Sequence, residues 1–101
     1  MLELTVRPQA RRDLREIWSY TRRRWSREQA DRYIARLRAA ISELRNHPDL
    51  GRPSNEVRPG LLRRLAERHV IYFRVTDERL LVVRILHGRM DPALHLANDD
   101  M

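Results

Sequence analysis

The stretch "RILHGRMD", residues 84–91, carries the side chains best able to do chemistry in this chain. Arg84 and Arg89 could hold a phosphate or a carboxylate, because the guanidinium group is planar and permanently charged. His87 ionises near neutral pH and could therefore move a proton. Together these residues could support phosphoryl transfer, which requires proton carriers and cations that stabilise the developing negative charge.

A metal site in the same region is disfavoured by the backbone. His87, Asp91 and His95 are four residues apart, a spacing that would direct all three side chains toward one metal ion if they lay on one helix. Gly88 and Pro92 interrupt any such helix. The chain contains no cysteine and only three glycines, so neither a thiolate site nor a glycine-rich phosphate loop is available. We therefore expect no metal and no cofactor.

Length and composition predict one small domain, residues 1–101, with a 42% hydrophobic content that suffices for one core. The N-terminus shows no signal pattern and no apolar run approaches a membrane span, so a cytoplasmic protein is the default expectation. The net charge is +7, with 21 basic residues, all of them arginine, against 14 acidic ones. This excess favours an acidic protein or a polyanion as partner. Direct nucleic-acid binding is possible from charge alone, but no helix-turn-helix signature supports it.

The N-terminal half predicts one strand and two helices. "LELTV" alternates with period two and indicates a strand over residues 2–6. After Pro8, apolar side chains recur every three or four residues and predict a helix to about Arg24, whose other positions read as a solvated face. "SREQ" at Ser26 has the form of a capping box and predicts a second helix to about Asn46. The short connection makes the two helices an antiparallel hairpin.

The C-terminal half changes to strand periodicity after a loop that extends to Gly60. "LLRRLAE", "HVIYFRVT" and "RLLVVRIL" predict three strands, with Asp77 and Glu78 near the last turn. The order β-α-α-β-β-β predicts an α+β fold, in which the N-terminal helical hairpin packs on one face of an antiparallel sheet.

The alternation within the last two strands predicts which residues share a face. If the odd-numbered loop 77–79 closes the hairpin between these two strands, the apolar residues of both strands point at the helices. A two-residue turn would place the two apolar sets on opposite faces of the sheet. These sets are Ile71, Phe73 and Val75 in one strand and Leu81, Val83 and Ile85 in the other. Tyr72, Arg74 and Arg84 would then cluster on the open face. His87 falls on the helix-facing side, where we expect a structural histidine bonded to backbone. Asp91 could cap a short terminal helix that begins at Pro92.

Several segments resemble a known family, in the same order along the chain. "ARRDLREIWSYTRRRW", "REQADRYIARL", "HPDLGRP", "HVIYFRV" and above all "RILHGRMD" are similar to the ParE toxins of the RelE/ParE superfamily, the toxin halves of bacterial toxin–antitoxin pairs. The resemblance implies the fold predicted above, neutralisation by a ParD-like antitoxin, and inhibition of DNA gyrase.

The related RelE-like toxins supply an alternative function, ribosome-dependent cleavage of messenger RNA. That reaction needs a general base and a general acid besides cations. Arg74 and Arg84 could serve as cations, but no convincing acid and base are present. We therefore expect binding rather than catalysis. The candidate residues for contact with the target or the antitoxin are Tyr72, Arg74, Arg84, His87 and Arg89.

Overall fold

The computed structural model describes residues 1–96. Along the chain, its elements are β1 (Glu3–Val6), α1 (Pro8–Arg24), α2 (Arg27–Asn46), the 3₁₀ helix η1 (Pro48–Leu50), β2 (Arg52–Pro53), β3 (Leu62–Ala66), β4 (His69–Val75), β5 (Arg79–His87) and α3 (Pro92–Leu96). This order confirms the predicted helices and the four longer strands. Within residues 1–96, no helix combines the length and the apolar character that crossing a membrane requires.

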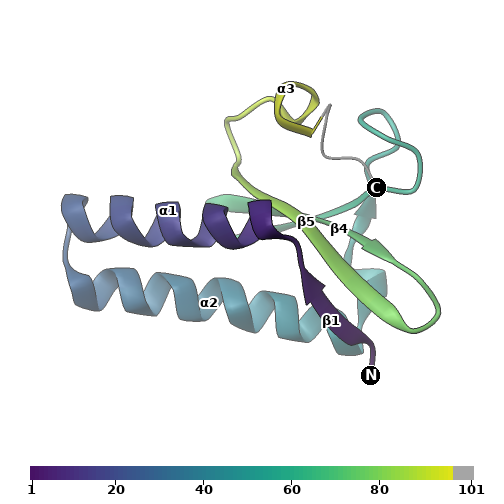
Figure 1. Ribbon diagram of the computed structural model, residues 1–101, viewed down its shortest axis with the longest axis horizontal. Coiled ribbons are helices and arrows are strands. Elements are labelled where there is room, and N and C mark those ends of the chain that lie inside the picture. Colours follow the sequence, from purple (N-terminus) through teal and green to yellow (C-terminus); the bar gives the residue numbers. More distant parts are fainter. Residues whose placement is uncertain (97–101) are drawn as a thin grey trace.

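Helices α1 and α2 form the predicted antiparallel hairpin and lie together on one side of the sheet (Figure 1). The cap predicted at Ser26 is present, since its hydroxyl accepts a hydrogen bond from the backbone N–H of Gln29 at 3.1 Å. In Figure 1 the connection between the two helices lies at the opposite end of the molecule from β1 and the N-terminus. The hairpin therefore presents one end to the region around β1 and carries its other end away from it.

The sheet has the strand order β1-β5-β4-β3-β2. All neighbouring strands are antiparallel except β1 and β5, which run parallel. The sheet is therefore mixed, whereas the sequence predicted an antiparallel one. Parallel pairing needs a long crossover, which the hairpin and the intervening strands supply. The two-residue strand β2 lies in the segment that was expected to be a loop.

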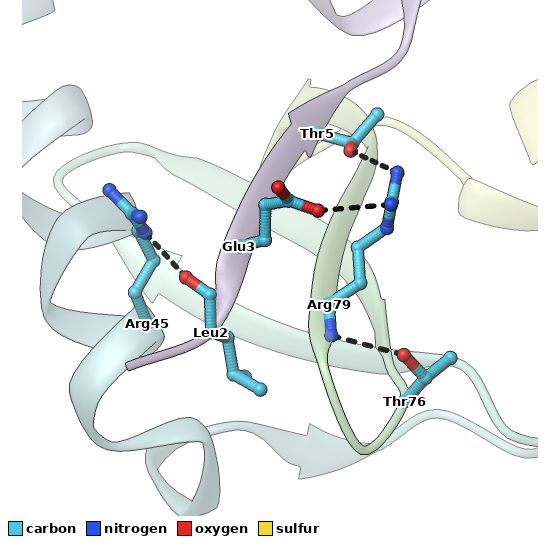
Figure 2. Close-up of polar contacts among 6 residues, drawn as sticks. All are labelled: Leu2, Glu3, Thr5, Arg45, Thr76 and Arg79. Atoms are coloured by element: carbon cyan, nitrogen blue, oxygen red, sulfur yellow. Dashed lines mark hydrogen bonds and ion pairs between the residues drawn. The ribbon is translucent and has the colours of Figure 1, made fainter.

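Side chains fasten β1 to its neighbours on both sides (Figure 2). Arg79 of β5 donates to the Thr5 hydroxyl at 3.1 Å and to the Glu3 carboxylate at 3.0 Å. On the other side, the Arg45 guanidinium of α2 donates to the carbonyl of Leu2 at 2.9 Å. These contacts hold the short edge strand in register with β5.

The hairpin between β4 and β5 differs from the predicted one. The N–H of Thr76 donates to the carbonyl of Arg79 at 2.9 Å and closes the turn. Asp77 and Glu78 lie between them, so the turn has an even number of residues. A bulge then shifts the register, because Tyr72 pairs with Arg84 whereas Phe73 pairs with Val82. The expectation of an odd-numbered turn is therefore wrong. The bulge restores the predicted pairing only beyond Val82.

The bulge changes which side chains of β5 face the helices. Leu80, Val82 and Ile85 belong to the main core between the sheet and the helical hairpin, together with Ile71 and Phe73. The prediction for Ile85 is therefore confirmed and that for Leu81 and Val83 is wrong. Val83 is buried in a second cluster, and Leu81 packs against it. An alternation rule that assumes a regular strand fails at an inserted residue.

The second cluster covers the sheet face that was expected to be open. Its buried members are Leu61, Tyr72, Val83, Leu86 and Leu96. Leu61 comes from the loop before β3 and Leu96 from α3, so both segments shield this face. Helix α3 begins as expected, because the Asp91 carboxylate accepts from the N–H of Ala93 at 3.0 Å. The sheet is thus packed on both sides.

Candidate functional site

A groove of about 750 Å³ lies between the helical hairpin and the adjoining ends of β4 and β5. We call it the hairpin groove. Its lining combines aromatic, basic and titratable side chains from α1, α2, the start of β4 and the end of β5. The lining residues are Asp13, Glu16, Ile17, Tyr20, Thr21, Trp25, Gln29, Arg32, Tyr33, Arg36, Arg68, His69, Arg84, Ile85, Leu86, His87 and Met90.

A buried ion pair forms part of this groove. The Asp13 carboxylate of α1 accepts from Nε and Nη2 of Arg84 at 2.8 and 3.0 Å. It also accepts from the backbone N–H of Ile85 at 2.9 Å. The Asp13 and Arg84 side chains are only 8% and 13% exposed. The paired geometry of a guanidinium and a carboxylate makes these hydrogen bonds strong and directional.

The course of the chain explains why a carboxylate is needed at this point. Strand β1 ends at Val6, which pairs with Val82, and the N–H of Arg7 donates to the Val82 carbonyl at 3.0 Å. The chain then enters α1, so on this edge β5 has no neighbouring strand beside Ile85, which pairs only with Ile71 of β4. Asp13 supplies the acceptor that a strand would otherwise provide.

Arg84 is therefore not on an open face, and that expectation is wrong. Besides the contacts to Asp13, its Nη1 donates to the carbonyl of His95 in α3 at 3.0 Å. The guanidinium thus ties α1, β5 and α3 together. An arginine within an apolar strand needs a partner, and here the partner is internal.

A second polar cluster joins α2 to the sheet. The Tyr33 hydroxyl of α2 lies 2.6 Å from Nδ1 of His69 and accepts from the backbone N–H of Arg68 at 3.1 Å. The rings of His69 and His87 meet edge to face, with their centroids 5.3 Å apart. His87 also accepts from the backbone N–H of Arg89 through Nδ1 at 3.1 Å. His87 thus lies on the helix side and bonds to backbone, as expected.

The electrostatics of this cluster favour uncharged side chains. Burial, with a smaller contribution from the neighbouring His87, lowers the pKa of His69 to about 4. Burial also raises the pKa of Tyr33 above its ordinary value. The Tyr33 hydroxyl and Nδ1 of His69 therefore share a hydrogen bond between two uncharged groups, and the tautomer of His69 sets which of them donates.

The remaining predicted residues lie apart from the hairpin groove. Tyr72 is only 3% exposed, within the second cluster. Arg74 is half-buried and donates to the carbonyl of Pro59 at 3.0 Å. Arg89 is exposed in the turn after β5. The predicted cluster of Tyr72, Arg74 and Arg84 therefore does not form a free surface.

Exposed apolar side chains mark the mouth of the hairpin groove. Tyr20 and Trp25 are each 56% exposed, and Met90 is 38% exposed. Arg32 and Arg68 are also exposed and line the same groove. This combination of aromatic side chains and arginine is typical of a protein-binding surface.

Sequence reasoning missed Asp13, Tyr33 and His69 as site residues. A signal for Asp13 was present, because it lies three residues after Ala10 and four before Ile17, on the edge of the apolar stripe. Tyr33 lies on the apolar stripe of α2, and that pattern gives no sign of a role for its hydroxyl. No local pattern marked His69.

Comparison with known proteins agrees on one family. Residues 4–92 match the family described as "ParE toxin of type II toxin-antitoxin system, parDE". Toxin ParE1 of Mycobacterium tuberculosis is 42% identical over 85 residues, which cover 83% of this chain and 87% of that protein. Toxin ParE1 of Caulobacter vibrioides is 38% identical, with 86% of this chain and 90% of that protein covered. Toxin ParE from Escherichia coli is also 38% identical, over 89% and 88%.

A solved structure shares the fold. A chain of the structure described as "Chromosomal ParDE TA system from P. aeruginosa" superposes with a TM-score of 0.78, at 23% identity, over 86% of this chain and 96% of that one. At that identity the likeness concerns the fold. With matches of 38% to 42% identity over most of its length, this chain belongs to the ParE toxin family of type II toxin–antitoxin systems.

Proposed function

We propose that this protein inhibits DNA gyrase by binding it, and that a ParD-like antitoxin neutralises it by occupying the hairpin groove. The observation that carries the antitoxin contact is the groove itself, which combines exposed Tyr20, Trp25 and Met90 with exposed arginines. An amphipathic acidic segment fits this lining, because its apolar side chains contact the aromatic rings and its carboxylates meet the guanidinium groups. The solved neighbour, described as a ParDE system, supports a partner of this kind. We place the action in the cytoplasm, where gyrase works.

The hydrogen bonds of the histidines support binding over RNA cleavage. A neutral imidazole has a single acceptor nitrogen, and a general base must leave that nitrogen available. In His87 Nδ1 already accepts from the N–H of Arg89, and in His69 Nδ1 is engaged with the Tyr33 hydroxyl. Arg84 was a candidate cation for stabilising the negative charge that develops during RNA cleavage, but its guanidinium group is paired with Asp13.

The target is tested by two assays run in parallel on the purified protein. We expect it to inhibit supercoiling by purified gyrase and to leave messenger RNA intact in a ribosome-dependent cleavage assay. The opposite pattern, with gyrase unaffected and messenger RNA cut, overturns the proposed target. Addition of a purified ParD-like antitoxin that binds this protein should restore supercoiling.

The antitoxin contact is tested by variants in the hairpin groove. Tyr20→Ser with Trp25→Ser removes two exposed aromatic rings, and we expect antitoxin binding to weaken by at least about tenfold, since buried aromatic anchors dominate interfaces. Leu65→Ser is the matched control, because Leu65 is 69% exposed on β3, away from the groove. Titration by calorimetry measures both. Equal affinity for the groove variant and the control places the antitoxin elsewhere.

A further inference from the structure

A second groove, of about 500 Å³, lies between β1 and the helical hairpin. We call it the β1 groove. Its floor is apolar, formed by Leu4, Val6, Leu14 and Ile34, and Trp18 forms one wall. The basic residues of its lining are Arg11, Arg15 and Arg38. The described lining includes no acidic residue.

The β1 groove is separate from the hairpin groove. The two linings share no residue. On α2, Ile34 and Arg38 line the β1 groove, whereas Arg32 and Arg36 line the hairpin groove. The two pairs are offset by two residues, which corresponds to a rotation of about 200° around the helix axis. The grooves therefore lie on opposite sides of the hairpin. If the antitoxin occupies the hairpin groove, as proposed above, the β1 groove stays uncovered in that complex.

The arginines of the β1 groove are available to a partner. All three are exposed. The Nε of Arg11 donates to the Val6 carbonyl at 3.2 Å, which orients the side chain and keeps its terminal nitrogens for other contacts. Within residues 1–96, neither the Arg15 nor the Arg38 side chain forms a hydrogen bond or an ion pair. The Trp18 ring is fixed, because its Nε1 donates to Asp31 at 2.8 Å.

We propose that the β1 groove binds an acidic segment of a partner protein that carries one bulky apolar side chain. The apolar side chain would rest on the floor between Leu4 and Ile34, against the fixed Trp18 ring, and carboxylates on either side would pair with Arg15 and Arg38. Charge complementarity decides the sign of the partner, since the lining is basic and apolar throughout its described part.

The same features favour a peptide over a nucleic acid. A nucleic-acid strand is held mainly through its phosphates, and that term needs basic residues but no apolar floor. The floor of the β1 groove contains aliphatic side chains from three elements, β1, α1 and α2, whereas bases stack on exposed aromatic faces. A leucine or phenylalanine side chain gains most from such a floor.

The test uses the purified full chain and a fluorescein-labelled short peptide in which glutamates flank a central leucine and phenylalanine. Binding is measured by fluorescence anisotropy. We expect Arg15→Gln with Arg38→Gln to weaken binding about tenfold, because two charge-assisted contacts are lost. The matched control, Arg12→Gln with Arg52→Gln, removes the same charge from exposed positions that line neither groove and should change binding by less than about twofold. Circular dichroism verifies that both variants are folded.

Two further probes separate the alternatives. A peptide with alanine in place of leucine and phenylalanine should bind on the order of tenfold more weakly, since the apolar anchor is removed. A single-stranded oligonucleotide should compete poorly with the acidic peptide. The proposal is overturned if both double variants lose affinity equally, if the alanine peptide binds as well, or if the oligonucleotide competes better. None of these outcomes bears on gyrase inhibition or antitoxin binding, which are measured separately.

Discussion

Removing the Asp13 carboxylate should destabilise the fold strongly. In Asp13→Ala, Arg84 loses two hydrogen bonds and its counter-charge, and the N–H of Ile85 loses its acceptor. Breaking a buried pair by removing one partner costs roughly 3–5 kcal/mol. We expect about 3 kcal/mol, because the hydrogen bond from Arg84 to the His95 carbonyl remains. A small domain has only about 5–15 kcal/mol of stability, so the loss is a large fraction.

Equilibrium urea unfolding, followed by tryptophan fluorescence and circular dichroism, measures the effect. At a slope of roughly 1–3 kcal/mol per molar urea, the midpoint should fall by about 1–3 M. Glu16→Ala is the control, because Glu16 lies on the same helix and is exposed, and its cost should stay within about 0.5 kcal/mol. The double variant Asp13→Leu with Arg84→Met should recover part of the stability, because it removes the unpaired buried charge but leaves the N–H of Ile85 without its acceptor. A loss below about 1 kcal/mol for Asp13→Ala would refute the assigned role.

Three further predictions concern stability. Gly51→Ala should cost about 1–3 kcal/mol of unfolding free energy, because a Cβ there would lie 2.3 Å from the Phe73 ring. Gly88→Ala is the control and should change little, since its nearest contact would be at 3.5 Å. Equal melting temperatures for the two variants in thermal denaturation would contradict this reasoning. Because the pKa of His69 is lowered to about 4 in the folded state, the unfolded chain binds a proton first, so stability should fall as pH drops from about 6.5 to about 4. His69→Gln should show a shallower pH dependence of the urea midpoint, and an unchanged slope would exclude His69 as the source. Ser26→Ala should lose about 1 kcal/mol of unfolding free energy through its cap, and an unaltered midpoint would show that the cap contributes nothing.

Local patterns predicted the helices and their boundaries well. The apolar spacing of α1 and α2 reflects a face that must be buried, and such spacing is visible in any window of the sequence. Ser26 and Asp91 act as caps through atoms only two or three residues away, so their roles were also readable. The family resemblance, carried by short segments in a fixed order, was confirmed by the comparisons.

The site was predicted less well, because its contacts join residues far apart in the sequence. Arg84 was predicted as a contact residue for the target or the antitoxin, but it binds Asp13, which lies 71 residues away on another element. The even-numbered turn placed Leu81 and Val83 on the opposite face, and the bulge between Val82 and Arg84 returned Ile85 to the predicted one. No residue in the stretch indicates an inserted position. Assignment of Tyr72 and Arg74 to an open face failed because the loop before β3 and α3 cover it.

The sequence by itself determined the α+β class, the helical hairpin, the strand positions, the basic charge and the family, because each depends on composition, on neighbouring residues or on ordered motifs. Only the tertiary structure decided that β1 pairs parallel to β5 and ends at Val6, which leaves Ile85 without a strand neighbour on the β1 side and makes Asp13 a buried acceptor. It also decided that "RILHGRMD" turns Arg84 inward and sets His87 against His69. Such partners are chosen by the packing of distant elements, and local spacing does not encode them.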